Sequence, residues 1–327
     1  MQKEKAPIGL YFLLIAVMAS WGVNVTMTKV LVSYFPTVTM TSFRIFTAAI
    51  TVIIILFITK KLRLPTKREF GLIFLASIFN IVIHHFFLSN GLKLTTGTNA
   101  GLILGSAPIV VAIFSVVFLR ERIGAWRALG FLAGIFGVSL VVLSNGTGIS
   151  GISLGDIDIF IAMASQAFSF IIIKKLAGSM DTGLMTGYML FLGSVMLFGL
   201  SRFMEPGGVS ELVAVHSWKL WLLFVVSAVV ATAFGNFVYN YAVGKIGPSR
   251  SAIFMNFNPL FSLIGALLFL GEAIKIPQLV GFVFIIIGVL LGSGALMDLI
   301  YERKKTKVRD PEKLLEKEVL LLLTFIL

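Results

Sequence analysis

A long apolar segment occurs twice in this chain, and the two copies align without a gap. The first begins at Ala107 and reads APIVVAIFSVVFLRERIGAWRALGFLAGIFGVSLVV; the second begins at Asn258 and reads NPLFSLIGALLFLGEAIKIPQLVGFVFIIIGVLLGS. Pro108 and Pro259 are 151 residues apart, and a pair of glutamates and two pairs of glycines keep this offset. Apolar composition alone does not produce a fixed offset across such different residue types. The pattern therefore indicates a duplicated membrane unit.

The composition is that of a protein embedded in a lipid bilayer. Of the 327 residues, 58% are hydrophobic and only 13% are charged, whereas a soluble protein of this size needs more polar surface. Apolar runs of about 20 residues recur, which is the length that crosses roughly 30 Å of hydrocarbon. We expect an all-α integral membrane protein with ten spans. Their predicted positions are 9–32, 37–59, 69–91, 97–119, 125–143, 155–174, 183–203, 218–241, 248–270 and 277–299.

Lysine and arginine are distributed unevenly over the connections between these spans. Twenty-one of the 27 lie on the side of the N-terminus, four lie on the opposite side, and Lys29 and Arg44 lie within spans. Because basic loops stay in the cytoplasm, we expect a multi-pass protein of a plasma membrane (a bacterial inner membrane) with both termini cytoplasmic. The same loops explain the net charge of +12 through anionic lipid headgroups rather than nucleic acid.

An odd number of spans in each half turns the second half upside down relative to the first. The predicted halves are residues 8–145 and 152–300, and a basic cytoplasmic tail follows at 301–327. Weaker matches near the front of the halves are 145 residues apart, as for Ser20 and Ser165. Two inverted five-helix repeats are related by a pseudo-two-fold axis in the membrane plane, and a central cavity is expected between them.

Polar side chains inside spans are costly in a bilayer, so they mark candidate sites. Trp21 in the first span could supply a flat wall, and Asn24 a paired donor and acceptor for a bound solute. Asn80 and His84 lie one turn apart in the third span, and His84 could bind a solute or move a proton. Hydrogen bonds between helices explain Asn24 and His84 equally well, so both interpretations stay open.

Further polar residues gather just before the two prolines and in the sixth and eighth spans. Proline in a spanning helix frees a backbone carbonyl, and polar groups at that level can form a site. Matched placement in both halves is the pattern expected of a binding region; the alternative is a pair of structural kinks whose carbonyls are capped by amides. The candidates for the cavity from these segments are Ser106, Gln166, Asn236, Tyr239 and Asn256.

Arg44 and four glycines have simpler interpretations. Arg44 lies well inside the second span, where it could contact an anionic group such as a carboxylate, but a structural role is favoured. The pairs Gly130/Gly134 and Gly288/Gly292 have the spacing that allows close helix contact. We expect this contact within one chain, in a monomer, with a homodimer as the alternative.

The sequence lacks the patterns of catalysis and metal binding. It has no cysteine, no Gly-rich phosphate loop, no HExxH and no GxSxG. No acidic residue lies near the middle of a span, so a carboxylate relay for protons or sodium is missing. We therefore predict a protein that is not an enzyme, has no catalytic residue and uses no metal or cofactor.

Several short motifs resemble the EamA family of the drug/metabolite transporter superfamily. They are WGVN in the first span, Phe43-Arg44 in the second, and the repeated proline–Phe-Leu–Glu–Gly hairpin at 107–137 and 258–288, within a ten-span duplicated layout. The resemblance covers about residues 8–300. It implies a basket of helices around a central cavity lined by spans one, three, four, six, eight and nine. The second half departs from the family pattern at Gln166, where the first half has Trp21.

Family members move small organic solutes and often export amino acids from bacteria, so the resemblance implies the same function class here. We expect a secondary transporter that works by alternating access, with a small-molecule substrate and the bilayer as its partners. An uncharged lining rich in amides and aromatic rings suits an amino acid or a related amphipathic solute. Export of cationic drugs and transport of nucleotide sugars or sugar phosphates are alternatives. A channel or a membrane-embedded enzyme is disfavoured, since neither a charged filter ring nor a catalytic constellation is found.

Overall fold

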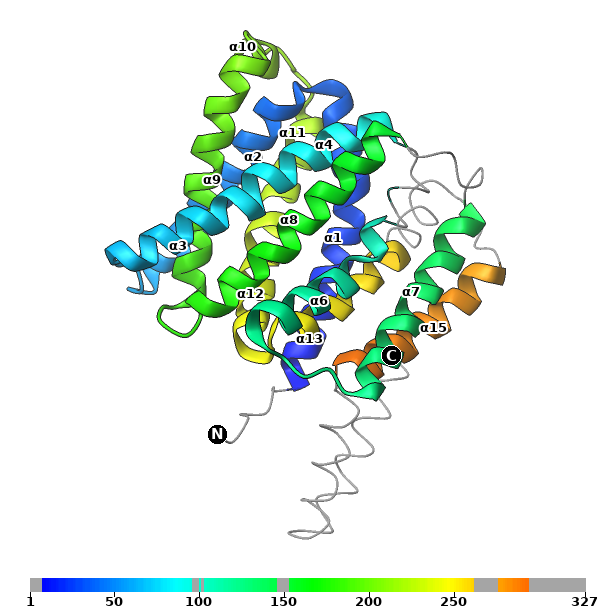
Figure 1. The fold of residues 1–327 in the computed structure, drawn as a ribbon. Coiled ribbons are helices and arrows are strands. Elements are labelled where there is room, and N and C mark those ends of the chain that lie inside the picture. Colours follow the sequence, from blue (N-terminus) through cyan, green and yellow to red (C-terminus); the bar gives the residue numbers. More distant parts are fainter. Residues whose placement is uncertain (1–7, 96–99, 101–102, 146–152, 262–275, 294–327) are drawn as a thin grey trace, which may run out of the picture.

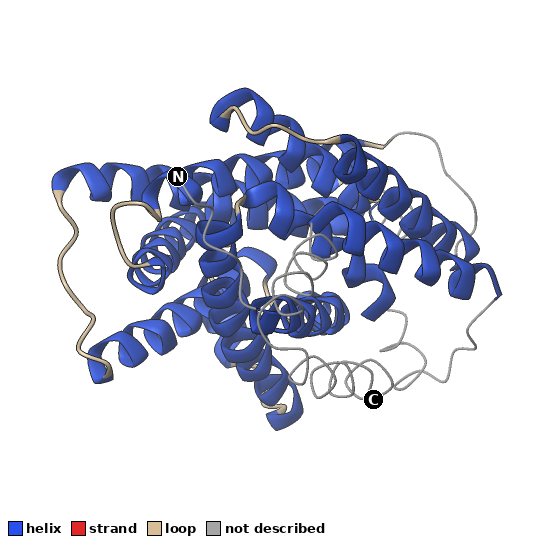
Figure 2. Cartoon of the chain, turned by 90° about the horizontal axis from the view of Figure 1, so that it is seen from below, coloured by secondary structure: helices blue, strands red, loops and turns tan. Residues whose placement is uncertain are grey.

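The computed structural model describes residues 8–95, 100, 103–145, 153–261 and 276–293, and every regular element among them is a helix (Figures 1 and 2). The first half contains α1 (Ile8–Tyr34), α2 (Thr37–Ile58), α3 (Lys67–Ser77), η1 (Ile78–Ile83), α4 (His84–Leu94), α6 (Ala107–Leu119) and α7 (Ala125–Asn145). The second half contains α8 (Leu154–Leu176), α9 (Thr182–Met204), α10 (Gly208–Val213), α11 (Trp218–Val226), η2 (Ser227–Phe234), α12 (Gly235–Ile246), α13 (Pro248–Ala252), η3 (Ile253–Asn256) and α15 (Ile276–Ser293).

Eight of the described helices are long and apolar enough to cross a membrane. Two of them are composite, because α3, η1 and α4 form one helix over Lys67–Leu94, and α11, η2 and α12 form another over Trp218–Ile246. The helix α6, in the predicted fourth span, has only 13 residues. The predicted fourth and ninth spans and the tail at 301–327 continue into, or lie in, residues outside the described ranges. The protein is therefore a multi-pass helical membrane protein, and the number of ten spans stays a prediction.

The helices α2 and α9 occupy matching places in the two halves but are capped differently. At the start of α9, the Asp181 carboxylate accepts hydrogen bonds from two backbone N–H groups of the first turn. At the start of α2, Pro36 has no side-chain donor or acceptor, and Glu205 from the far end of α9 accepts from Val38 N at 3.0 Å and Thr39 N at 2.8 Å. A carboxylate is favourable at a helix N-terminus, so this contact also ties the two halves together.

The helices α7 and α15 form a tight pair (Figure 1), and four of their glycines face one another. A Cβ atom on Gly130 would lie 2.4 Å from Gly292 N, and one on Gly288 would lie 2.6 Å from Gly134 N. Only glycine permits backbones to approach this closely. The predicted glycine contact within one chain is confirmed.

The other helices pack in matched pairs across the two halves. The helix α1 lies against η2 and α12, and α8 lies against η1 and α4; likewise α2 contacts η2, and α9 contacts η1. The helices α2 and α9 also pack on each other. In Figure 1, α1 and α8 run in opposite directions. This pairing is what two inverted halves would produce, and the inverted repeat itself stays a prediction.

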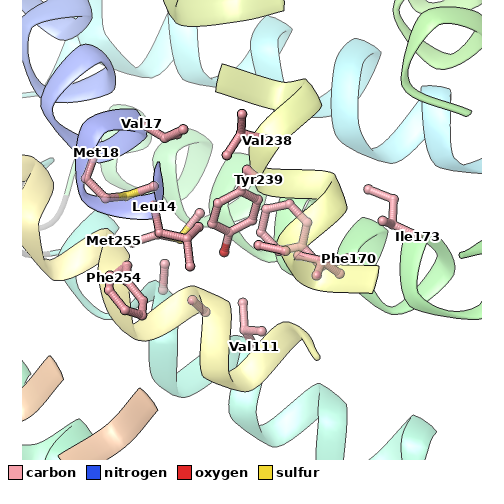
Figure 3. Packing of buried hydrophobic residues seen from close by; sticks show 14 of the residues in the cluster. Leu14, Val17, Met18, Val111, Phe170, Ile173, Val238, Tyr239, Phe254 and Met255 are labelled. Carbon is pink, nitrogen blue, oxygen red and sulfur yellow. The ribbon is translucent and has the colours of Figure 1, made fainter. Parts of the chain in front are cut away.

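A large buried cluster forms where α1, α6, α8, α12 and η3 meet (Figure 3). The Tyr239 ring lies between Leu14 and Met255 on one side and Phe170 on the other, with Val111 below its hydroxyl group. Leu14 comes from the N-terminal half of α1 and Phe170 from the C-terminal third of α8, and the others come from α12, η3 and α6. The cluster fills this part of the bundle with apolar contacts, while the polar candidates lie on adjacent turns of α1 and α8.

Candidate functional site

Two π-helical segments organise the polar side chains of the bundle. The segment η1 interrupts the composite helix Lys67–Leu94, and η2 interrupts Trp218–Ile246. A π-helical turn replaces the usual backbone hydrogen bonds with longer-range ones and frequently marks a functional site. Five of the ten candidate side chains from the sequence lie on these segments or bond to them: Trp21, Asn24, Arg44, Asn80 and Asn236.

Trp21 connects α1 to η2. Its Nε1 donates to the carbonyl of Ala231 at 2.8 Å. The indole fits because residue 235 is glycine; a Cβ atom on Gly235 would lie 2.4 Å from Trp21 Nε1. The rings of Trp21 and Tyr239 lie 5.1 Å apart. The Nε1 donor is therefore used by the protein, and the indole face remains for packing.

Arg44 is buried at 3% exposure and reaches across to η2. Its Nη1 donates to Thr232 Oγ1 at 2.9 Å and to Ser227 Oγ at 3.2 Å, and the Ser227 hydroxyl donates to Asn24 Oδ1 at 2.5 Å. Nε has no hydrogen-bond partner among the described residues, and no described carboxylate lies within ion-pair distance of the guanidinium. Arg44 does not snorkel to the membrane surface; it places a positive charge among neutral hydroxyl groups.

The residues around η1 form a second group, made by α8. Asn80 Nδ2 donates to Ser169 Oγ at 2.6 Å, and Ser165 Oγ donates to the Phe79 carbonyl at 2.5 Å. Ser165 and Ser169 stand 145 residues after Ser20 and Asn24 of α1. The matched residues Asn24 of α1 and Ser169 of α8 therefore bond to opposite π-helical segments, whereas Ser20 bonds within its own helix.

His84 lies at the end of η1 and is held on both ring nitrogens. Nδ1 lies 3.0 Å from the Ala162 carbonyl, and Nε2 lies 3.3 Å from Gln166 Nε2. A carbonyl can only accept, so Nδ1 carries the proton, and in a neutral ring Nε2 accepts from the Gln166 amide. His84 is buried, whereas Gln166 is half-buried. The bond to Gln166 therefore fixes which end of that amide is left free.

Three further candidates lie on α12 or at the start of α6, and both of these helices pack against α8. Asn236 is half-buried, and its Nδ2 donates to the Thr232 carbonyl of its own helix at 2.8 Å. Ser106 donates to the Ile103 carbonyl and lies 3.5 Å from Met163 Sδ on α8. The Tyr239 hydroxyl is buried and has no hydrogen-bond partner among the described residues.

Asn256 is separate from the other candidates. It is fully buried, and its amide lies against α7, where a Cβ atom on Gly134 would come within 2.1 Å of Nδ2. Neither amide atom has a described hydrogen-bond partner. No hydrogen bond joins Asn256 to η1 or η2 in the described part of the chain, although residues of η3 belong to the buried cluster around Tyr239.

Ser227 is the residue that sequence reasoning missed. It is one of many serines in apolar helices, and nothing in its sequence context distinguishes it from Ser194 or Ser201, which bond only to their own helix. No signal in the sequence identifies the Ala231 and Phe79 carbonyls either, because backbone acceptors carry no side-chain signature. The described residues contain no group of three or more side chains able to hold a metal ion.

A model of the EamA-like transporter family matches residues 8–143 and again residues 153–294. The chain belongs to the EamA-like transporter family. An uncharacterized transporter, YyaM, of Bacillus subtilis (strain 168) is 25% identical over 91% of this chain and 98% of its own length. An uncharacterized transporter of Archaeoglobus fulgidus is 24% identical over 83% and 94%.

Two further similarities are more distant. A WAT1-related chloroplast protein of Arabidopsis thaliana is 26% identical over 63% of this chain and 50% of its own length. A protein of known crystal structure superposes with a TM-score of 0.73 at 15% identity, over 90% of this chain and 99% of its own. The second similarity concerns the fold alone. Membership of the EamA family makes this chain a membrane transporter, and the names of its relatives point to transport rather than catalysis.

Proposed function

We propose that this EamA-family protein is a secondary transporter that moves amino acids or related amphipathic metabolites by alternating access, most simply as an exporter. The observation that carries the proposal is the pair of polar groups at η1 and η2. Each group joins one half of the chain to the other, because α1 bonds to η2 and α8 bonds to η1. A binding region between two halves that can rock is the arrangement on which alternating access depends.

The buried cluster around Tyr239 supports a carrier rather than a channel. The aromatic rings of Trp21, Tyr239 and Phe170 form a continuous aromatic layer from α1 to α8, with centroids 5.1 and 4.9 Å apart and ring planes tilted by 39° and 49°. An open pore through this layer would have to separate these rings. In the proposed cycle, this aromatic layer closes one side of the site, and rocking of the two halves separates the rings.

The chemistry of the site supports a zwitterionic or anionic cargo. Arg44 has no described counter-ion, and an uncompensated positive charge repels cationic solutes. This argues against export of cationic drugs. The same charge is compatible with a sugar phosphate, so phosphate-bearing solutes are the second candidate. An ATP-driven pump is not proposed, because the chain has no nucleotide-binding motif.

The predicted topology and assembly belong to the same proposal. The halves are residues 8–145 and 152–300, both termini are cytoplasmic, and the protein lies in a plasma membrane. A monomer is sufficient, because the glycine faces of α7 and α15 are occupied by each other.

Counterflow in proteoliposomes tests the transport proposal. We expect saturable exchange of at least one labelled amino acid, and we expect Asn236→Ala to abolish it without lowering the melting temperature. Ser194→Ala is the matched control, because that hydroxyl bonds only to its own helix on α9. Flux that never saturates and ignores Asn236→Ala would indicate a channel. Exchange of sugar phosphates alone would replace the amino-acid cargo.

A further inference from the structure

We propose that the hydrogen bonds around η1 and η2 fix the polarity of the site, with a donor at Asn24 and acceptors at Gln166 and Asn236. The ligand that fits this pattern is a zwitterion whose carboxylate faces Asn24 and whose ammonium group faces Gln166 and Asn236. This inference rests on the proposed transport function and names its substrate class.

The donor end follows from the bonds made by Ser227. A hydroxyl group has one proton to donate. Ser227 Oγ accepts from Arg44 Nη1 at 3.2 Å and lies 2.5 Å from Asn24 Oδ1, so its proton goes to Asn24. The carbonyl oxygen of the Asn24 amide is therefore occupied, and Nδ2 is left with two protons and no acceptor among the described residues. Asn24 is half-buried, so a ligand can reach this amide.

Positive charge reinforces the donor end. Arg44 acts through Ser227, since the guanidinium is buried and bonds to that hydroxyl rather than to Asn24 directly. A cation that donates to a hydroxyl strengthens the bond which that hydroxyl gives to the next acceptor. Arg44 is thus a positioning residue, and its charge favours an anionic group at Asn24.

The acceptor end follows from His84 and from the Thr232 carbonyl. Gln166 Nε2 is used by His84 Nε2, and Asn236 Nδ2 is used by the carbonyl of Thr232. Each amide therefore keeps its oxygen, Oε1 of Gln166 and Oδ1 of Asn236, for a ligand. Both side chains are half-buried, like Asn24. Amide oxygens accept hydrogen bonds from an ammonium group and carry no net charge. A carboxylate in their place would also attract the Arg44 guanidinium.

The aromatic layer of Trp21, Tyr239 and Phe170 relates the positions of the Asn24 and Gln166 amides. Trp21 and Phe170 both pack on Tyr239, from α1 and α8 respectively. Asn24 follows Trp21 by three residues, and Gln166 precedes Phe170 by four, on helices that run in opposite directions (Figure 1). Each amide therefore lies about one turn, roughly 5 Å, from the aromatic layer on the same side of it. In this proposal the aromatic layer bounds one side of the site. The Asn24 donor lies on α1, and the Gln166 acceptor lies on α8.

The substitution Asn24→Asp replaces the donor with an acceptor and keeps the hydrogen bond from Ser227. An aspartate oxygen accepts from Ser227 as the asparagine does, while the freed NH₂ group becomes a second oxygen. The probes are the twenty common L-amino acids and, for each that raises the melting temperature of the purified protein, its methyl ester and its decarboxylated amine. We expect the wild-type protein to bind the amino acid at least about tenfold more tightly than the ester. In Asn24→Asp this preference is lost or reversed.

Two further variants keep the test decisive. Asn90→Asp makes the same chemical change on α4, outside both hydrogen-bonded groups, and leaves the preference intact. Ser227→Ala removes the hydroxyl that orients Asn24 without adding a charge, and reduces the preference about threefold or more; it serves if Asn24→Asp does not fold. A wild-type protein that binds an amino acid and its ester equally, or an Asn24→Asp protein that keeps the wild-type preference, overturns the inference and leaves transport intact. A wild-type protein that binds no amino acid overturns the proposed cargo itself.

Discussion

The π-helical segments η1 and η2 are the same backbone device surrounded by different chemistry. On the η2 side, α2 contributes a buried arginine, and α1 contributes Trp21 and Asn24. On the η1 side, α9 contributes Gly193, where a Cβ atom would lie 2.4 Å from Ile81 Cβ, and α8 contributes two serines. Arg44 on α2 corresponds by the 145-residue offset to Met189 on α9. The segment η2 is therefore held by a charge as well as by hydrogen bonds, whereas η1 is held by close packing and by hydrogen bonds between neutral groups.

This difference teaches where a duplicated fold can diverge. The packing of helix on helix has to be preserved in both halves because it keeps the bundle together. The polar groups need not be the same, and a site between unlike walls can bind a ligand with unlike ends. Under the proposed function, the asymmetry between η1 and η2 would let two similar halves orient a solute with unlike ends.

The largest expected effect of breaking this asymmetry is on transport. We expect Arg44→Met to reduce exchange of a carboxylate-bearing cargo on the order of 10- to 100-fold, because it removes the buried charge that bonds to η2. Stability should change little, since Ser227 and Thr232 keep acceptors for their own protons at Asn24 and at the Ser227 carbonyl. Counterflow and thermal melting of the same preparation measure the two effects.

The control for Arg44→Met is Met189→Leu, at the corresponding position of α9. This buried, volume-conserving change should alter neither transport nor melting temperature beyond a small shift. Unchanged exchange in Arg44→Met would show that the positive charge does not contribute to recognition.

A smaller effect, on stability, is expected at the packed side. Gly193→Ala places a Cβ atom 2.4 Å from Ile81 Cβ, and neither atom lies at the flexible end of a side chain. We expect a loss of about 1–3 kcal/mol from overpacking, measured by denaturant unfolding in detergent. Gly199→Ala on the same helix is the control, because no atom lies within 4 Å of its Cβ position. Equal stability of the two variants would contradict close packing of α9 on η1.

The smallest effect separates the two matched serines of α1 and α8. Ser165 donates across to the Phe79 carbonyl, whereas Ser20 donates to Val17 of its own helix. Ser165→Ala should therefore cost about 1 kcal/mol, and Ser20→Ala should cost less than half of that. Parallel melting curves of the two variants measure this difference. A larger loss in Ser20→Ala would contradict the assignment of the bond between helices to Ser165 rather than to Ser20.

The sequence predicted the helical membrane class and the approximate limits of the spans, since apolar length and basic loops act locally. It also predicted the glycine contact between α7 and α15, because a four-residue spacing of small residues defines a helix face. It did not predict η1 or η2, since a π-helical turn changes neither composition nor hydrophobicity. For Arg44 it left an anion contact and a structural role open, and the structure gives the buried guanidinium two hydroxyl partners on η2.

The sequence by itself determined what kind of protein this is: a duplicated, multi-pass helical chain with rare polar residues at identifiable positions. Only the tertiary structure decided which atom of each polar residue is already used. Asn24 bonds to a serine 203 residues away, and Gln166 to a histidine 82 residues away. An amide carries a donor and an acceptor at once, so its contribution to a site depends on which of them a distant neighbour has taken. Local sequence does not determine which atom of the amide is bonded, because the partner lies on a helix that meets it only in the folded bundle.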